Sequence, residues 1–265
     1  MTIHFFTVVC NGMPFIRRHL RVFERLKMPW HWHICEGASH THDGAPAPVT
    51  NAAGMSTDGT TEYLDSLAAH PHVTVTRDTR HYLTWRCNEM LRGITEECLA
   101  WQVDVDEFWT ASQIETMYAM FCKDRRRLAA QFWCNYFVGP GLVLERKEGA
   151  GNYGRQEWLR VWRWEPGCAY AGHDPPFVVY PVGPSFMFSY TRDETAAAGL
   201  IFNHYAFVRE AQVEFKACRY GWPGAVDRWR ALQVAALPAP IEKFMPWLGR
   251  GTVVREKPED EFKEE

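Results

Sequence analysis

The sequence predicts an α/β fold in which a mostly parallel β-sheet carries helices on both faces, with a smaller mixed region in the second half of the chain. Three observations support this. Short apolar, β-rich segments alternate with amphipathic helical segments over the first half, the order typical of parallel strands joined by helices. Of the 265 residues, 46% are hydrophobic, which suffices for one large core or for two closely packed subdomains. The 12 Trp and 16 Phe residues argue against disorder.

The first half supplies four expected strands, each a short apolar run bounded by turn residues, at 3–10, 31–37, 73–75 and 98–103. Helices are expected between and after them, at 14–26, 60–69, 84–94 and from 112 onward. Pro14 favours a first helical turn, and Ser112 with Glu115 forms a capping-box signature. Residues 38–59 lack apolar periodicity and are expected to form a long surface loop.

The second half is less regular. Strands are expected at 128–138, 158–164, 177–180 and 200–207, and helices at 210–220 and 225–236. A Gly-rich span occupies 139–154, and the Gly- and Pro-rich span 166–184 is expected to be loop. The tail at 255–265 is strongly charged and is expected to be disordered.

The composition argues against several classes of protein. A net charge of -3 gives no broad attraction for nucleic acid, and no nucleic-acid motif occurs. The eight cysteines include no Cys-x-x-Cys pair, which favours reduced thiols in a cytoplasmic protein over a zinc ribbon or redox site. No apolar run is long enough to span a bilayer, so we expect no transmembrane segment, while peripheral membrane contact stays open.

Two acids stand directly after the fourth expected strand. Asp104 and Asp106 are alternate residues of an extended segment, so they share one face of the chain. Two carboxylates at the carboxyl edge of a parallel sheet suit a hard divalent cation, which commonly neutralises a diphosphate. The alternative is a solvated acidic turn. The apolar residues on either side of this motif favour the ligand-binding interpretation.

Several segments together resemble the GT-A glycosyltransferases, specifically the family-2-like enzymes with a DxD motif. The resemblance is carried by residues 8–12, Glu36, Asn88, 104–107 and 203–205. It implies a GT-A, Rossmann-like sheet in which residues 1–138 bind a nucleotide sugar and residues 139–254 shape the acceptor site. The chain departs from the family in having Glu36 where many members have Asp, and in lacking an obvious Glu-Asp acceptor motif.

The resemblance implies a metal site and a nucleotide site. The implied metal ligands are Asp104, Asp106 and His204, with Mn²⁺, or alternatively Mg²⁺, as the cation. The implied nucleotide contacts are Asn11, Glu36, Arg86, Asn88 and Asp104. Each has a structural alternative. Asn11 also suits a turn, Glu36 a cap on the next segment, and His204 a hydrogen-bonded core position, while Arg86 and Asn88 also suit a helix surface.

An inverting transferase needs a general base for the acceptor hydroxyl. Asp174 is the first candidate and His173 the second, although Asp174 between His173 and Pro175 also suits a plain turn. The aromatic residues Trp162, Trp164 and Tyr170 suit either stacking on a sugar or core packing. The His pairs at 31 and 33 and at 40 and 42 lack the further ligands that a closed zinc site needs.

The sequence therefore predicts a metal-dependent glycosyltransferase. The donor is a nucleoside diphosphate sugar, UDP-linked by preference, and inversion is slightly preferred. The acceptor is a hydroxyl of a glycan, a lipid-linked sugar or a small molecule. Two alternatives stay open: a sugar nucleotidyltransferase, and a catalytically inactive carbohydrate- or nucleotide-binding protein of the same fold.

Overall fold

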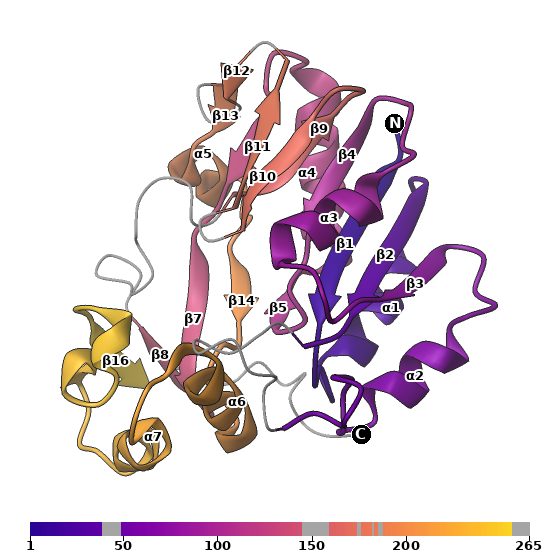
Figure 1. Ribbon diagram of the computed structural model, residues 1–265. Coiled ribbons are helices and arrows are strands. Elements are labelled where there is room, and N and C mark those ends of the chain that lie inside the picture. The colour runs from indigo at the N-terminus through magenta and orange to yellow at the C-terminus, as the bar shows by residue number, and fades with distance from the viewer. Residues whose placement is uncertain (39–48, 145–158, 174–175, 182, 185–187, 256–265) are drawn as a thin grey trace.

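The computed structural model of the protein describes residues 1–38, 49–144, 159–173, 176–181, 183–184 and 188–255 (Figure 1). A seven-stranded sheet has the order β13-β6-β9-β4-β1-β2-β3. Strands β4, β1, β2 and β3 are mutually parallel, whereas β9 runs antiparallel to both of its neighbours. The strands are β1 (Ile3–Val9), β2 (Trp30–Glu36), β3 (Val73–Arg77), β4 (Cys98–Gln102), β6 (Ala129–Gln131), β9 (Leu159–Trp164) and β13 (Ser189–Tyr190). This sheet confirms the predicted α/β class.

Helices cover both faces of the large sheet (Figure 1). On one face, α1 (Ile16–Phe23), α2 (Thr60–Ser66) and α4 (Ala111–Lys123) contribute to one core cluster. On the other face, α3 (Leu83–Leu91) contributes to a second cluster. Phe5 of β1 belongs to the first cluster and Phe6 to the second. Because both faces of β1 are buried, its sequence is a nearly continuous apolar run.

Helix α4 begins two residues earlier than the capping signature predicted. Its N-cap is Thr110, whose hydroxyl accepts a hydrogen bond from Gln113 N at 3.2 Å, while the Gln113 side chain accepts one from Thr110 N at 2.9 Å. The capping box predicted at Ser112 and Glu115 is therefore wrong. The sequence carries two overlapping signatures of this kind, and the extended backbone of Thr110 determines which one is used.

A six-stranded sheet has the order β15-β16-β8-β7-β14-β5 and occupies the lower part of Figure 1. Its core side is closed by α6 (Glu210–Tyr220) and α7 (Ala225–Gln233), which bury Val213, Trp229 and Leu232. The strand predicted at 128–138 is wrong as a single strand, because it divides into β6 and β7, one in each sheet. The strands are β5 (Glu107–Phe108), β7 (Cys134–Gly139), β8 (Leu142–Leu144), β14 (Phe202–His204), β15 (Ala239–Pro240) and β16 (Thr252–Arg255).

The two sheets exchange chain segments. The large sheet takes β9 and β13 from beyond residue 138, and the six-stranded sheet takes β5 from before it. The sheets are therefore not divided at residue 138. The assignment of nucleotide binding to residues 1–138 and acceptor binding to 139–254 stays a functional prediction.

Other expectations for the second half need correction. The strand predicted at 177–180 is confirmed as β11 (Pro176–Tyr180). The rest of the span 166–184, predicted as loop, supplies β10 (Ala169–His173) and β12 (Gly183–Pro184), which form an antiparallel sheet with β11. Its prolines stand at strand ends, where a missing N–H costs least. The strand predicted at 200–207 is confined to β14. Three short helices were not predicted: α5 (Arg192–Ala197), η2 (Ile241–Lys243) and η3 (Pro246–Leu248).

Parts of three predicted segments lie outside the described residues: 39–48 of the long loop, 145–154 of the Gly-rich span and 256–265 of the tail. Residues 49–59 form turns and bends without regular structure, as expected for a loop. Among the described helices, none combines the length and apolar character needed to cross a membrane.

Candidate functional site

The acidic turn follows β4 at the edge where the parallel strands end. Val103 N donates to Phe6 O at 3.1 Å, and Thr7 Oγ1 donates to Val103 O at 2.7 Å, which fixes the end of β4 against β1. The Val105 carbonyl, between the two aspartates, accepts a hydrogen bond from the buried His19 Nε2 at 3.0 Å. These contacts hold the backbone of the turn on both sides of Asp104.

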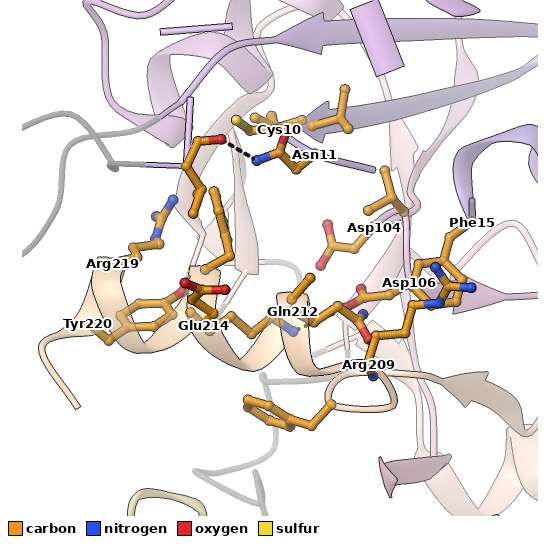
Figure 2. A pocket seen from close by; sticks show the side chains of 18 of the residues that line it. Cys10, Asn11, Phe15, Asp104, Asp106, Arg209, Gln212, Glu214, Arg219 and Tyr220 are labelled. Carbon is orange, nitrogen blue, oxygen red and sulfur yellow. Dashed lines mark hydrogen bonds and ion pairs between the residues drawn. The ribbon is translucent and has the colours of Figure 1, made fainter. Parts of the chain in front are cut away.

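A cavity of about 1060 Å³ brings this turn together with the tip of β1 and with α6. Figure 2 shows Asn11 on one side, Asp104 pointing into the space, and Glu214 and Arg219 on α6 across from them. A cavity at the carboxyl ends of parallel strands is the usual ligand site of an α/β sheet. Four residues predicted from the sequence line this cavity: Asn11, Asp104, Asp106 and His204.

Asp106 is the most strongly paired acid of the cavity. Its side chain is buried, Lys216 Nζ from α6 donates to Oδ2 at 3.1 Å, and His204 Nε2 from β14 lies 3.4 Å from Oδ1. Burial disfavours the charged carboxylate, but Lys216 and His204 outweigh it and hold the pKa of Asp106 well below its usual range. Asp106 is therefore ionised, and segments far apart in sequence meet at its carboxylate.

Asp104 and Glu107 have opposite environments. The Asp104 side chain is 29% exposed, accepts a hydrogen bond from Gln102 Nε2 at 3.1 Å, and lies 3.6 Å from Arg160 Nη2. Glu107 is fully buried and pairs with Arg160, whose Nη2 lies 2.6 Å from Oε1. Burial raises the pKa of Glu107, although Arg160 opposes the shift. Asp104 lines the cavity, whereas Glu107 belongs to the structure behind it.

Asn11 combines a structural role with a place in the cavity wall. It has a left-handed backbone with φ 55°. Its Nδ2 donates to Val49 O at 2.9 Å, and its Oδ1 accepts from Thr57 N at 2.8 Å. The amide therefore holds the segment before α2 against the tip of β1, as the turn interpretation expects, while the residue still borders the space available to a ligand.

Glu36 ends β2 but lies outside the cavity lining. The residue is fully buried, and its Oε2 accepts a hydrogen bond from Arg77 Nε at 3.0 Å. Its Oε1 accepts hydrogen bonds from Thr61 Oγ1 and from Ser56 N. These contacts match the structural alternative, in which the carboxylate fixes the following segment. Contact between Glu36 and a nucleotide stays a prediction.

Arg86 and Asn88 on α3 also lie outside the cavity lining and bind backbone groups. The buried Arg86 guanidinium donates to the carbonyls of His81, Gly37 and Ala38, at 2.8 to 2.9 Å. Asn88 accepts a hydrogen bond from Tyr170 N at 2.9 Å and donates to Tyr170 O at 2.7 Å, which attaches β10 to α3. Both side chains therefore brace irregular backbone, a role that differs from the helix-surface pair considered from sequence.

The predicted acceptor-side residues are only partly described. Asp174 lies outside the described residues, and for His173 the structure gives the backbone of β10 alone. Trp162, Trp164 and Tyr170 are all buried in the core cluster that contains α3, which settles them as packing residues. Their rings are therefore inaccessible to a sugar.

Sequence reasoning missed the contribution of α6. Polar residues of this helix line the cavity: Gln212, Glu214, Lys216 and Arg219. Aromatic residues do so as well: Phe215, Tyr220, Trp222 and Trp247. A signal was available: Lys216 lies three residues after the buried Val213, so a charge falls on the inward face of the helix. A cation on a buried helical face requires a partner, and here Asp106 is that partner.

Two of the three predicted metal ligands, Asp106 and His204, lie side by side. Asp106 Oδ1 and His204 Nε2 are 3.4 Å apart, close to the separation of about 3 Å between adjacent ligands at bonds of about 2.1 Å. Within the described residues, no group of three or more His, Cys, Asp and Glu side chains is arranged to hold a metal ion. A cation held by Asp106 and His204 would need its remaining ligands from water and substrate phosphates, an arrangement common for Mg²⁺. The metal site stays a prediction.

No protein-family model matches the chain, and no curated protein matches it. Among similar solved structures are S. aureus TarS 1–349 (14% identity, TM-score 0.43) and the same fragment in complex with UDP-GlcNAc (12%, 0.42). Each alignment covers 62% of this chain, and 47% and 45% of TarS 1–349, respectively. The chain thus spans about half the length of that fragment.

The mannosyltransferase PcManGT from Pyrobaculum calidifontis, in complex with GDP-Man and Mn²⁺, is also similar. It shares 15% identity at a TM-score of 0.49, and the alignment covers 93% of this chain and 67% of that one. Structures similar to this chain thus include a mannosyltransferase and proteins bound to nucleotide sugars. The resemblance is distant, and the α/β class rests on this chain's own sheets and helices.

Proposed function

We propose that the protein transfers a sugar from a nucleoside diphosphate sugar to an acceptor hydroxyl. The observation that carries this proposal is the convergence of Asn11, Asp104 and Asp106 at the carboxyl ends of β1 and β4, in a cavity of about 1060 Å³. That volume lies at the upper limit of the 300 to 1,000 Å³ typical of small-ligand sites, which is large enough for a nucleotide sugar.

The donor half of the cavity lies between the tip of β1 and the acidic turn. Val8, Val9 and Cys10 offer an apolar wall for the nucleoside, and the diphosphate would lie between Asp104 and the cations of α6. We propose UDP as the preferred nucleotide. Asp104, Asp106 and His204 would hold the divalent cation, which when bound neutralises charge on the leaving diphosphate. Metal dependence is therefore part of the proposal.

The acceptor half lies toward the carboxyl end of α6. Glu214 is exposed and lines the cavity, and Tyr220 and Trp222 stack there with ring centroids 4.9 Å apart. Aromatic rings offer a stacking surface for sugars, and a carboxylate beside them is placed to accept the proton of an acceptor hydroxyl. We propose inversion with Glu214 as the general base. Asp174 and His173 stay predictions for the same role.

A specific observation counts against the sugar nucleotidyltransferase. Such an enzyme needs backbone N–H groups after the first strand to receive phosphate. Here the three successive N–H groups of that turn already have side-chain partners from residues 56–60, at the start of α2. They are Asn11 N to Ser56 Oγ at 3.0 Å, Gly12 N to Thr60 Oγ1 at 2.8 Å and Met13 N to Asp58 Oδ2 at 2.8 Å. This turn therefore suits a nucleoside better than a phosphate.

Calorimetric titration with UDP and GDP, with and without Mn²⁺, tests the proposal. We expect one of them to bind with micromolar affinity and Mn²⁺ to strengthen the binding. A screen of nucleotide sugars for Mn²⁺-dependent hydrolysis then identifies the donor. Binding of free sugars without any nucleotide binding would instead identify the inactive, lectin-like alternative and overturn the transferase.

A further inference from the structure

Lys216 brings a positive charge to the position where the sequence predicted only a metal ion. Its Nζ lies 3.1 Å from Asp106 Oδ2 and 2.8 Å from Ala206 O, so two of the three ammonium N–H groups are used by these partners. The ammonium also lies 4.8 Å from the Phe207 ring centroid. The side chain is nevertheless 25% exposed and lines the cavity, so a ligand can reach it.

The acidic turn is therefore largely neutralised by the protein itself. Arg160 lies beside Asp104 and Glu107, and Lys216 lies beside Asp106. Three carboxylates thus face two cations, which leaves one net negative charge when His204 is neutral. A divalent cation that arrives alone meets little uncompensated charge and competes with Lys216 for Asp106. A diphosphate that arrives with the cation removes this competition, because its oxygens can replace Asp106 as acceptors of the Lys216 hydrogen bonds.

The position on α6 makes this exchange possible. Arg219 follows Lys216 by three residues, so both lie on the same side of the helix, and both line the cavity. A lysine carries its charge on a flexible four-carbon stem, so the ammonium can turn between neighbouring oxygens without movement of the helix. A diphosphate beside Asp104 would lie between the acidic turn and these two cations.

We propose that Lys216 is a diphosphate-binding residue that neutralises Asp106 in the free protein and turns to a diphosphate oxygen when the nucleotide binds. The divalent cation then enters with the nucleotide, and the cation alone binds weakly. This inference rests on the proposed function, because it requires a nucleoside diphosphate in the cavity. No covalent bond is made or broken in the exchange.

Calorimetry on the full chain tests the inference, with UDP and GDP as diphosphates and UMP and GMP as monophosphates. Lys216→Met is compared with Lys243→Met, a control at an exposed position outside the cavity lining. We expect Lys216→Met to lower diphosphate affinity about tenfold to a hundredfold, as for a lost hydrogen bond to a charged group, and to lower monophosphate affinity much less. The control should match the wild type.

Two results would overturn the inference while the proposed function stands. The first is wild-type diphosphate affinity in a folded Lys216→Met. The second needs no variant: tight binding of Mn²⁺ to the wild type without nucleotide, measured by electron paramagnetic resonance of the free ion. If Lys216→Met does not fold, the inference is tested by nucleotide calorimetry on Lys216→Gln and by the Mn²⁺ titration of the wild type. Failure of the wild type to bind UDP and GDP would overturn both proposals.

Discussion

Arg160 and Glu107 form a buried ion pair in which the guanidinium Nε lies 2.9 Å from both carboxylate oxygens and Nη2 lies 2.6 Å from Oε1. The pair joins β9 of the large sheet to β5 of the six-stranded sheet. Glu107 Oε2 also accepts a hydrogen bond from Asp104 N at 3.4 Å. The last acid of the motif therefore supports the turn that presents the first two.

Loss of this pair should lower stability. Glu107→Gln leaves the buried guanidinium of Arg160 with only the more distant Asp104 carboxylate, 3.6 Å away, as counter-charge. Breaking a buried pair in this way costs about 3 to 5 kcal/mol. Urea unfolding should show this decrease, while Glu242→Gln at an exposed position should change stability by less than about 0.5 kcal/mol. The double variant Glu107→Leu, Arg160→Met should recover part of the lost free energy of unfolding. A decrease below about 1 kcal/mol for Glu107→Gln would contradict the structural role.

Asp106→Asn should strongly lower sugar transfer in a chain that still folds. The variant loses the charge that positions Lys216 and that would hold the cation, and a lost electrostatic group of this kind costs about 100-fold to 1,000-fold in turnover. Donor hydrolysis and transfer should both decrease. Asp227→Asn, on an exposed face of α7, is the matched control. Activity above about one tenth of the wild type in Asp106→Asn would exclude the role assigned to this carboxylate.

Glu214→Gln should separate transfer from donor binding. If Glu214 accepts the acceptor proton, transfer should decrease about 100-fold to 10,000-fold, while UDP or GDP affinity stays unchanged. Glu210→Gln serves as the control on the same helix, because Glu210 pairs with Arg230 at the surface. A decrease in nucleotide affinity that matches the decrease in rate would place Glu214 on the donor side instead.

His19 should make stability depend on pH. Burial lowers the pKa of His19 to about 4, although its hydrogen bond to the Val105 carbonyl opposes the shift, while the unfolded chain keeps a value near 6.5. The unfolded state therefore binds the proton first as the pH falls. Stability is fully present above pH 6.5 and decreases toward pH 4, by about 2 kcal/mol between pH 7 and pH 5.

Urea unfolding at pH 7 and pH 5 checks this dependence. His19→Gln retains a donor for the Val105 carbonyl but cannot titrate, so its stability should decrease less over the same interval. The variant is expected to be less stable at both pH values, because Gln fills the apolar site less well. An equal decrease in the wild type and the variant would assign the pH dependence to other groups.

The acidic turn could be predicted because its position depends on residues that are close to it in the sequence. Asp104 and Asp106 follow a buried strand in a strand-helix alternation, and parallel strands present their carboxyl ends at one edge. Sequence spacing could not show that Glu107 turns inward, because that depends on Arg160 in a strand more than 50 residues later. The same limit applies to His204, which reaches Asp106 through the pairing of β14 with β5.

The polar residues of α3 illustrate a different limit. Arg86 and Asn88 resemble ligand-binding residues in composition, yet their partners are backbone groups of Gly37, Ala38 and Tyr170. A polar side chain that hydrogen-bonds to irregular backbone and one that binds a ligand look the same in the sequence. Only the tertiary structure distinguishes them: β10 lies against Asn88, and the backbone just after β2 lies against Arg86.

The exchange of strands between the two sheets has a consequence for how the chain can be divided. A fragment that ends at residue 138 would lack β9, and with it the neighbour of both β4 and β6, while the complementary fragment would lack β5 and most of β7. Each piece would leave open sheet edges that attract other chains. Expressed separately, the pieces should aggregate, and co-expression should restore a heterodimer that elutes with the intact chain on size exclusion.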